Sequence, residues 1–95
     1  MDQIKIGKFI ATLRKEQNMT QMELASKLAV TDRAISKWEN GRGLPDLSLV
    51  LSLSEVLNVS VNELLSGERI EEEHYQEKLE ENIVQTIEYS ENKIR

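Results

Sequence analysis

The stretch from Thr20 to Asn40, TQMELASKLAVTDRAISKWEN, constrains the fold more than any other part of the chain. Thr20 and Thr31 are both of the type that caps the N-terminus of a helix. Glu23 follows Thr20 by three residues, and together they form the capping-box pattern of a helix start. Ala29 and Val30 separate the two starts. The pattern predicts two short helices joined by a tight turn.

Each of these helices has one apolar face. Leu24 and Leu28 are four residues apart and lie on one face of the first helix. Ala25 beside them is small enough to let another helix cross closely. Ile35 and Trp38, three residues apart, form the stripe of the second helix. The opposite face of the second helix carries hydrogen-bond donors and positive charge, which suit phosphates and base edges: Arg33, Ser36, Lys37 and Asn40.

The motif T-Q-x-E-L-A, then eight residues, then A-I-S-K-W-E-N-G-R resembles the helix-turn-helix of the Cro/C1-type (XRE-like) regulators over roughly residues 4–65. The resemblance implies an all-α fold, a five-helix lambda-repressor-like DNA-binding domain. It implies sequence-specific binding to double-stranded DNA by a transcriptional regulator, in the first place a repressor. Ala29 departs from the family, in which glycine is common. If the site needs positive φ, alanine costs on the order of 1 kcal/mol; the turn could instead be right-handed.

The resemblance also assigns the DNA contacts. It implies that Gln21 contacts a phosphate, and that Asn40 and Arg42 bind the DNA backbone. The first two turns of the second helix would reach base edges through Asp32, Arg33, Ser36 and Lys37, and its cap residue Thr31 is a further DNA-binding candidate. Arg33 or Lys37 suits guanine O6 and N7, and Asp32 can accept from a cytosine amine. Asp32 could equally cap the helix and pair with Arg33, and the whole face could simply be solvated.

Arg14 and Glu39 form a second pair of interest. Glu39 adjoins Trp38, and Arg14 follows the apolar stripe of the first helix of the chain. The resemblance implies a partly buried ion pair between them, with the structural role of holding the first helix to the DNA-reading helix.

Three further helices are expected around the central motif. Asp2 can cap a helix over about residues 3–17, with a stripe of Ile4, Ile6, Phe9, Ile10 and Leu13. Asp46 can cap another that Asn58 ends. Leucines alternate there as in a strand, but no partner strand exists, and Leu47, Val50, Leu53 and Leu57 also fit a helical face. Ser60 and Glu63 form a second capping box, opening a short helix that ends at Leu64-Leu65.

The charge changes at residue 67. Residues 1–66 hold eight Lys or Arg and eight Asp or Glu, whereas residues 67–95 hold four and nine, so the net charge of −5 belongs to the tail. A neutral domain can still present one basic face. We therefore divide the chain into a DNA-binding domain, residues 1–66, and an acidic amphipathic helical tail, residues 67–95.

The tail predicts one helix over about residues 70–91. Tyr75, Leu79, Ile83 and Ile87 recur every four residues and need something to bury against. We expect a homodimer in which this helix crosses the helix after Asp46 in the same or the neighbouring subunit. Leu49 and Val56, off the expected core face, would offer the docking surface.

Two other interpretations stay open. The chain could be an antitoxin-like interaction module whose 70–91 helix docks on a partner protein. It could also be the front of a longer sensor or membrane-linked regulator, because Lys93-Ile94-Arg95 carries no helix-terminating signal.

Several classes of function are not expected. The chain holds no cysteine, which excludes disulfides and thiolate metal sites and fits a cytoplasmic protein. No signal peptide and no apolar run of membrane-spanning length is present, so we expect no membrane contact. The single histidine, His74, lies among glutamates and is expected to be solvated. We find no catalytic or metal-binding pattern and expect neither an enzyme nor a cofactor.

Overall fold

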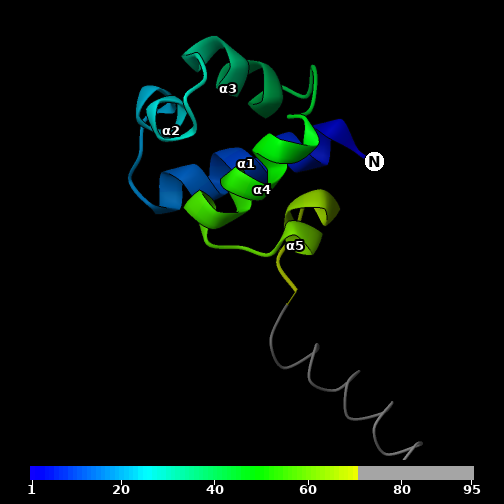
Figure 1. Cartoon of the computed structure of the whole chain (residues 1–95). Coiled ribbons are helices and arrows are strands. Elements are labelled where there is room, and N and C mark those ends of the chain that lie inside the picture. Colours follow the sequence, from blue (N-terminus) through cyan, green and yellow to red (C-terminus); the bar gives the residue numbers. More distant parts are fainter. Residues whose placement is uncertain (71–95) are drawn as a thin grey trace, which may run out of the picture.

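A computed structural model describes residues 1–70 of the chain, which form five α-helices and no strand (Figure 1). The helices are α1 (Gln3–Glu16), α2 (Gln21–Leu28), α3 (Asp32–Glu39), α4 (Leu47–Leu57) and α5 (Val61–Ser66). The all-α prediction is confirmed. The helix predicted over residues 70–91 lies outside the described residues.

Every helix begins at the residue that the sequence predicts. The side chains of Asp2, Thr20, Thr31, Asp46 and Ser60 each accept a hydrogen bond from a backbone N–H of the following turn. In α2 and α5 the capping box is complete, because the side chain of the third helical residue accepts a hydrogen bond from the backbone N–H of the cap residue. These bonds satisfy N–H groups that have no partner within the helix.

Three helices, α2, α4 and α5, are followed by a C-cap residue in the left-handed conformation. Asn58 follows α4 with φ of 61°, as expected for an asparagine at this position. Ala29 follows α2 with φ of 58°. Of the two alternatives for Ala29, the turn therefore takes the strained one. The first helix ends at Glu16, one residue earlier than expected, and Gln17 is its C-cap.

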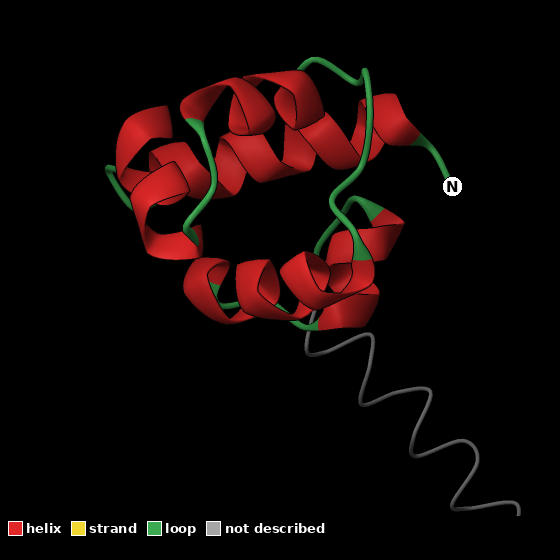
Figure 2. Ribbon diagram, turned by 45° about the horizontal axis from the view of Figure 1, so that its top comes forward, coloured by secondary structure: helices red, strands yellow, loops and turns green. Residues whose placement is uncertain are grey.

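One core holds the helices together. Its buried side chains come from all five helices: Ile6, Ile10, Leu13, Leu24, Ala25, Leu28, Ile35, Trp38, Val50, Leu53, Leu57 and Leu64. Helix α1 packs against α3, α4 and α5, and α4 and α5 lie together on one side (Figure 2). A side chain at Gly7 of α1 would collide with the carbonyl of Trp38. Because Gly7 has no side chain, α1 can approach α3 closely.

The expected faces of two helices need correction. Ile4 was expected to widen the α1 stripe but is 59% exposed. On α4, Leu47 was expected in the core but is 72% exposed, whereas Leu49 and Val56 pack against the core. At 100° per residue, Leu49 and Val56 share one flank of α4, and Leu47 shares the other with Leu51. The domain covers the first flank and leaves Leu47 and Leu51 in solvent.

Candidate nucleic-acid interface

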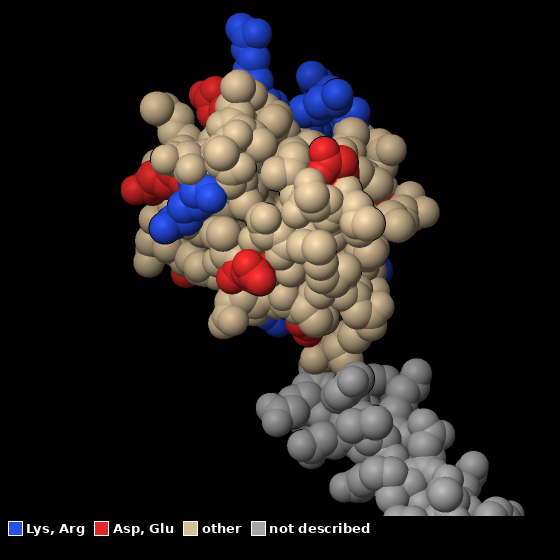
Figure 3. Space-filling view, in the orientation of Figure 1, with Lys and Arg blue, Asp and Glu red and all other residues tan. Residues whose placement is uncertain are grey.

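Helix α3 is divided sharply into a buried and an exposed face. Ile35 and Trp38 are in the core, while Arg33 and Lys37 on the other side are exposed. Lys and Arg side chains project from the end of the molecule that α3 occupies, with acidic side chains beside them (Figure 3). The buried stripe thus orients the two cations outward, one turn apart on the same helix.

The start of α3 is organised by Thr31. Its hydroxyl oxygen accepts a hydrogen bond from the backbone N–H of Ala34, at 3.2 Å. Asp32 is exposed in the first helical turn, where negative charge is favourable. Between residues 1 and 70, none of the ion pairs includes Asp32. Thr31 is therefore the cap, and Asp32 stands in the first turn without pairing to Arg33.

The exit of α3 is also held by local bonds. Nδ2 of Asn40 donates to the carbonyl of Ser36 at 2.8 Å and to its hydroxyl oxygen at 3.2 Å. The N–H of Arg42 donates to the carbonyl of Lys37 at 3.0 Å, and the Arg42 side chain is exposed. The Lys37 side chain extends across the following loop, where a Cβ on Gly43 would lie 2.8 Å from Lys37 Cε. Ser36, Lys37, Asn40 and Arg42 are thereby brought together at one end of α3.

Behind α3, Glu39 joins three helices. Arg14 of α1 donates from Nε to Glu39 Oε2 at 2.7 Å and from Nη2 to Oε1 at 3.0 Å. The two side chains are only 10% and 7% exposed. The hydrogen bond to Glu39 raises the pKa of Arg14 above its ordinary value, against the opposing effect of burial. Arg14 also donates from Nη1 to the carbonyl of Met19 at 2.8 Å, in the segment before α2.

Gln21 is the third member of this cluster. Its Nε2 donates to Glu39 Oε1 at 2.9 Å, which places the first residue of α2 against the last residue of α3. The sequence motif pointed to Gln21 as a phosphate contact but gave no sign of this bond. A glutamine amide offers two N–H donors and an acceptor oxygen, so one bond to Glu39 leaves capacity for a phosphate.

No metal-binding cluster of three or more His, Asp or Glu side chains occurs between residues 1 and 70. None of the five helices is long and apolar enough to cross a membrane. His74 lies beyond the described residues.

Comparison with known proteins places these features in a family. The family model described as "Helix-turn-helix" matches residues 10–64, which include the whole of α2, α3 and α4. The chain is 45% identical over 58 residues to the HTH-type transcriptional activator BcrR of Enterococcus faecalis, covering 61% of this chain and 28% of BcrR. It is 31% identical over 61 residues to the cryptic phage CTXphi transcriptional repressor RstR of Vibrio cholerae, covering 64% of this chain and 54% of RstR. The chain thus spans about half or less of the length of these relatives.

Solved structures agree with this assignment. The restriction-modification controller protein C.AhdI of Aeromonas hydrophila superposes with a TM-score of 0.62 and 25% identity, covering 66% of this chain and 96% of C.AhdI. With the two capped helices, the polar face of α3 and the family match over residues 10–64, the chain belongs to the helix-turn-helix family of regulators, as its resemblance to the Cro/C1 type predicts.

Proposed function

We propose that this chain binds double-stranded DNA sequence-specifically and regulates transcription. One observation carries the proposal: α3 turns Arg33 and Lys37 outward, while Ile35 and Trp38 fix its opposite face in the core. A helix held in this way can enter the major groove, which is wide enough to admit it. Similar proteins named as a repressor and as an activator support the regulatory role.

Each residue of the interface has a proposed role. Arg33 and Lys37 read base edges, preferably guanine O6 and N7, and Asp32 accepts from a cytosine amine. Ser36 lies on the same face, one turn after Asp32. Thr31 and Gln21 contact phosphates at the starts of their helices, where unpaired N–H groups favour anions. Asn40 and Arg42 bind the DNA backbone at the exit of α3.

The protein would act as a homodimer, since a single helix covers only a few base pairs of the major groove. Two recognition helices in a two-fold dimer reach half-sites about one helical turn apart. Its activity would be binding rather than catalysis, and binding to genomic DNA would place it in the cytoplasm. Nothing in the domain favours the antitoxin-like alternative over a regulator.

The test begins with selection of DNA from a random pool by the purified protein, followed by binding measurements on the selected site. Arg33→Ala should weaken binding by roughly 1–3 kcal/mol and relax the preference at one base position. Lys37→Ala should do the same at a second position. Lys8→Ala, an exposed cation on α1, is the matched control and should leave the preference unchanged.

Two results would contradict these assignments. If the pool yields no preferred sequence, the domain does not read DNA sequence. If Arg33→Ala weakens binding to all sequences equally, Arg33 contacts a phosphate and base reading belongs to other residues.

A further inference from the structure

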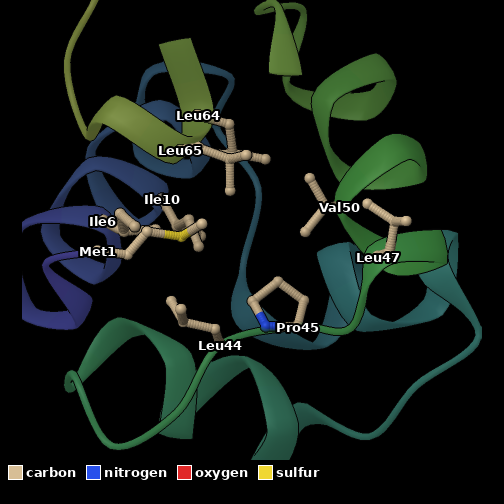
Figure 4. A pocket seen from close by; sticks show the side chains of 9 residues that line it. All are labelled: Met1, Ile6, Ile10, Leu44, Pro45, Leu47, Val50, Leu64 and Leu65. Atoms are coloured by element: carbon tan, nitrogen blue, oxygen red, sulfur yellow. The ribbon is translucent and has the colours of Figure 1, made fainter. Parts of the chain in front are cut away.

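An apolar groove opens between α1, the segment before α4, α4 and α5, and no residue of α2 or α3 lines it (Figure 4). It has a volume of about 190 Å³. Ile6, Ile10, Val50 and Leu64 form its buried floor. The groove is therefore built from elements other than α2 and α3.

The rim of this groove carries large apolar side chains that are exposed to solvent. Met1 and Leu47 line it and are 81% and 72% exposed. Burying apolar surface of this kind lowers the free energy, because the contact of apolar surface with water is unfavourable. The volume is below the roughly 300–1,000 Å³ of pockets that hold drug-sized ligands, so a few side chains from a helix suit it better than a small molecule.

The sequence after the described domain contains apolar residues at helical spacing, which could cover the apolar groove. Residues 71–95 follow the described domain, and Tyr75, Leu79, Ile83 and Ile87 recur within them every four residues. A helix with such a stripe is marginal in water unless the stripe is buried. Within residues 1–70, no further side chain fills the groove.

The chain leaves the domain against α1 and α5, two of the helices that line the groove. Glu68 pairs with Lys5 of α1 at 3.3 Å, and Arg69 pairs with Glu16 of α1 at 2.7 Å. The N–H of Ile70 donates to Glu63 Oε2 of α5 at 2.9 Å. The same two helices line the groove through other residues, Ile6 and Ile10 of α1 and Leu64 and Leu65 of α5. Tyr75 is five residues further on, within roughly 17 Å of Ile70 for an extended chain.

We propose that the apolar stripe of residues 71–95 covers this groove in the same chain. A segment joined by so short a linker meets its own groove at an effective concentration in the millimolar range, well above that of a second molecule in dilute solution. The charge of the segment agrees with this placement. It carries eight glutamates against three Lys or Arg, and binding at the groove keeps them away from phosphates at α3.

The absence of cysteine from the chain makes a disulfide test clean. The full chain would carry Leu47→Cys together with one of Tyr75→Cys, Leu79→Cys or Ile83→Cys on the stripe. The matched controls pair Leu47→Cys with Glu77→Cys, Glu81→Cys or Glu88→Cys, which fall on the opposite face of the predicted helix. Replacing Leu47 leaves the core intact because its side chain is exposed. Circular dichroism and Trp38 fluorescence check the fold of each variant.

We expect at least one stripe pair to form a disulfide at least tenfold faster than every control pair, because a disulfide needs Cα atoms about 4.4–6.8 Å apart. The product should run as a monomer on a non-reducing gel, at a rate independent of protein concentration. Equal rates on both faces, or no disulfide in any pair, would refute the docking. A disulfide-linked dimer as the main product would show that a neighbouring chain supplies the segment, and would overturn the proposal for the same chain. No DNA enters this experiment, so its failure is separate from that of the proposed function.

Discussion

At the scale of single residues, Ala29 is the position at which sequence and backbone disagree. It ends α2 with φ of 58°, a left-handed conformation that alanine adopts only at a cost of about 1–2 kcal/mol. Its N–H bonds to the carbonyls of Ala25 and Ser26 hold the turn in place. The turn matters because it sets the relative placement of α2 and α3.

We expect Ala29→Gly to stabilise the protein by on the order of 0.5–1 kcal/mol, since glycine relieves the strain but gains entropy in the unfolded chain. Urea unfolding of both proteins measures the difference. Asn58→Gly is the matched control: Asn58 has φ of 61°, but asparagine tolerates this region, so the gain should be smaller. If Ala29→Gly destabilises the protein, the alanine methyl group contributes more to the free energy of unfolding than the left-handed backbone conformation takes away.

From the residues alone, contacts were foreseen only where a local pattern indicates them, whereas the Arg14–Glu39 pair, 25 positions apart, was expected from the family resemblance. Thr20 and Ser60 were identified as caps because a capping box is complete within four residues of sequence. The bond from Gln21 to Glu39 and the approach of Gly7 to Trp38 join residues 18 and 31 positions apart. No local spacing encodes such contacts, because they depend on how the helices cross.

At the scale of elements, the cluster of Arg14, Glu39 and Gln21 ties α1, α2 and α3 together. The carboxylate of Glu39 accepts from both partners and is nearly buried. Removing one partner leaves a buried charge unpaired, which typically costs about 3–5 kcal/mol and less where the site is partly open.

We therefore expect Arg14→Met and Glu39→Leu each to destabilise the domain, and the double variant to be more stable than the sum of the two losses predicts. Urea unfolding of all four proteins gives the coupling energy. Lys15→Met is the control, because Lys15 is exposed in the same turn of α1. Additive losses would show that the pair contributes nothing of its own.

The helices themselves were largely predictable, and their faces less so. Five starts and the helical nature of α4 followed from caps and from the lack of a partner strand. The face of α4 was misjudged because its leucines alternate. At 100° per residue, Leu47 and Leu51 lie on the side of the helix opposite Leu49 and Leu53, and the sequence holds no signal for which side the domain covers. The apolar groove between α1, α4 and α5 follows from that same flank and could not be anticipated.

At the scale of the whole molecule, charge separates the two parts of the chain. Residues 1–66 are neutral, and the acidic excess lies in residues 67–95. Acidic side chains close to the exposed cations Arg33, Lys37 and Arg42 would weaken their attraction to phosphates, so DNA binding is favoured when the acidic part lies elsewhere. The proposed docking of residues 71–95 at the groove is compatible with this requirement, because no α3 residue lines the groove.

The proposed homodimer makes a geometric prediction about the DNA. Two copies of α3 related by a two-fold axis can enter the major groove on one face of the duplex when the half-site centres are about 34–36 Å, or a multiple of this distance, apart, and we expect the single-turn spacing. Inserting five base pairs between the half-sites of the selected sequence turns the second half-site by roughly half a helical turn, away from the second subunit. We expect this insertion to reduce binding to the level of a single half-site, with mobility-shift titrations of the full chain as the measurement.

A ten-base-pair insertion is the matched control. It returns the second half-site to the same face of the duplex but doubles the separation, so a rigid dimer should not recover its affinity for this DNA. Sedimentation of the complex with the unaltered site should give two chains per duplex. Equal affinity for all three DNAs, with one chain bound to each, would show that the protein reads DNA as a monomer.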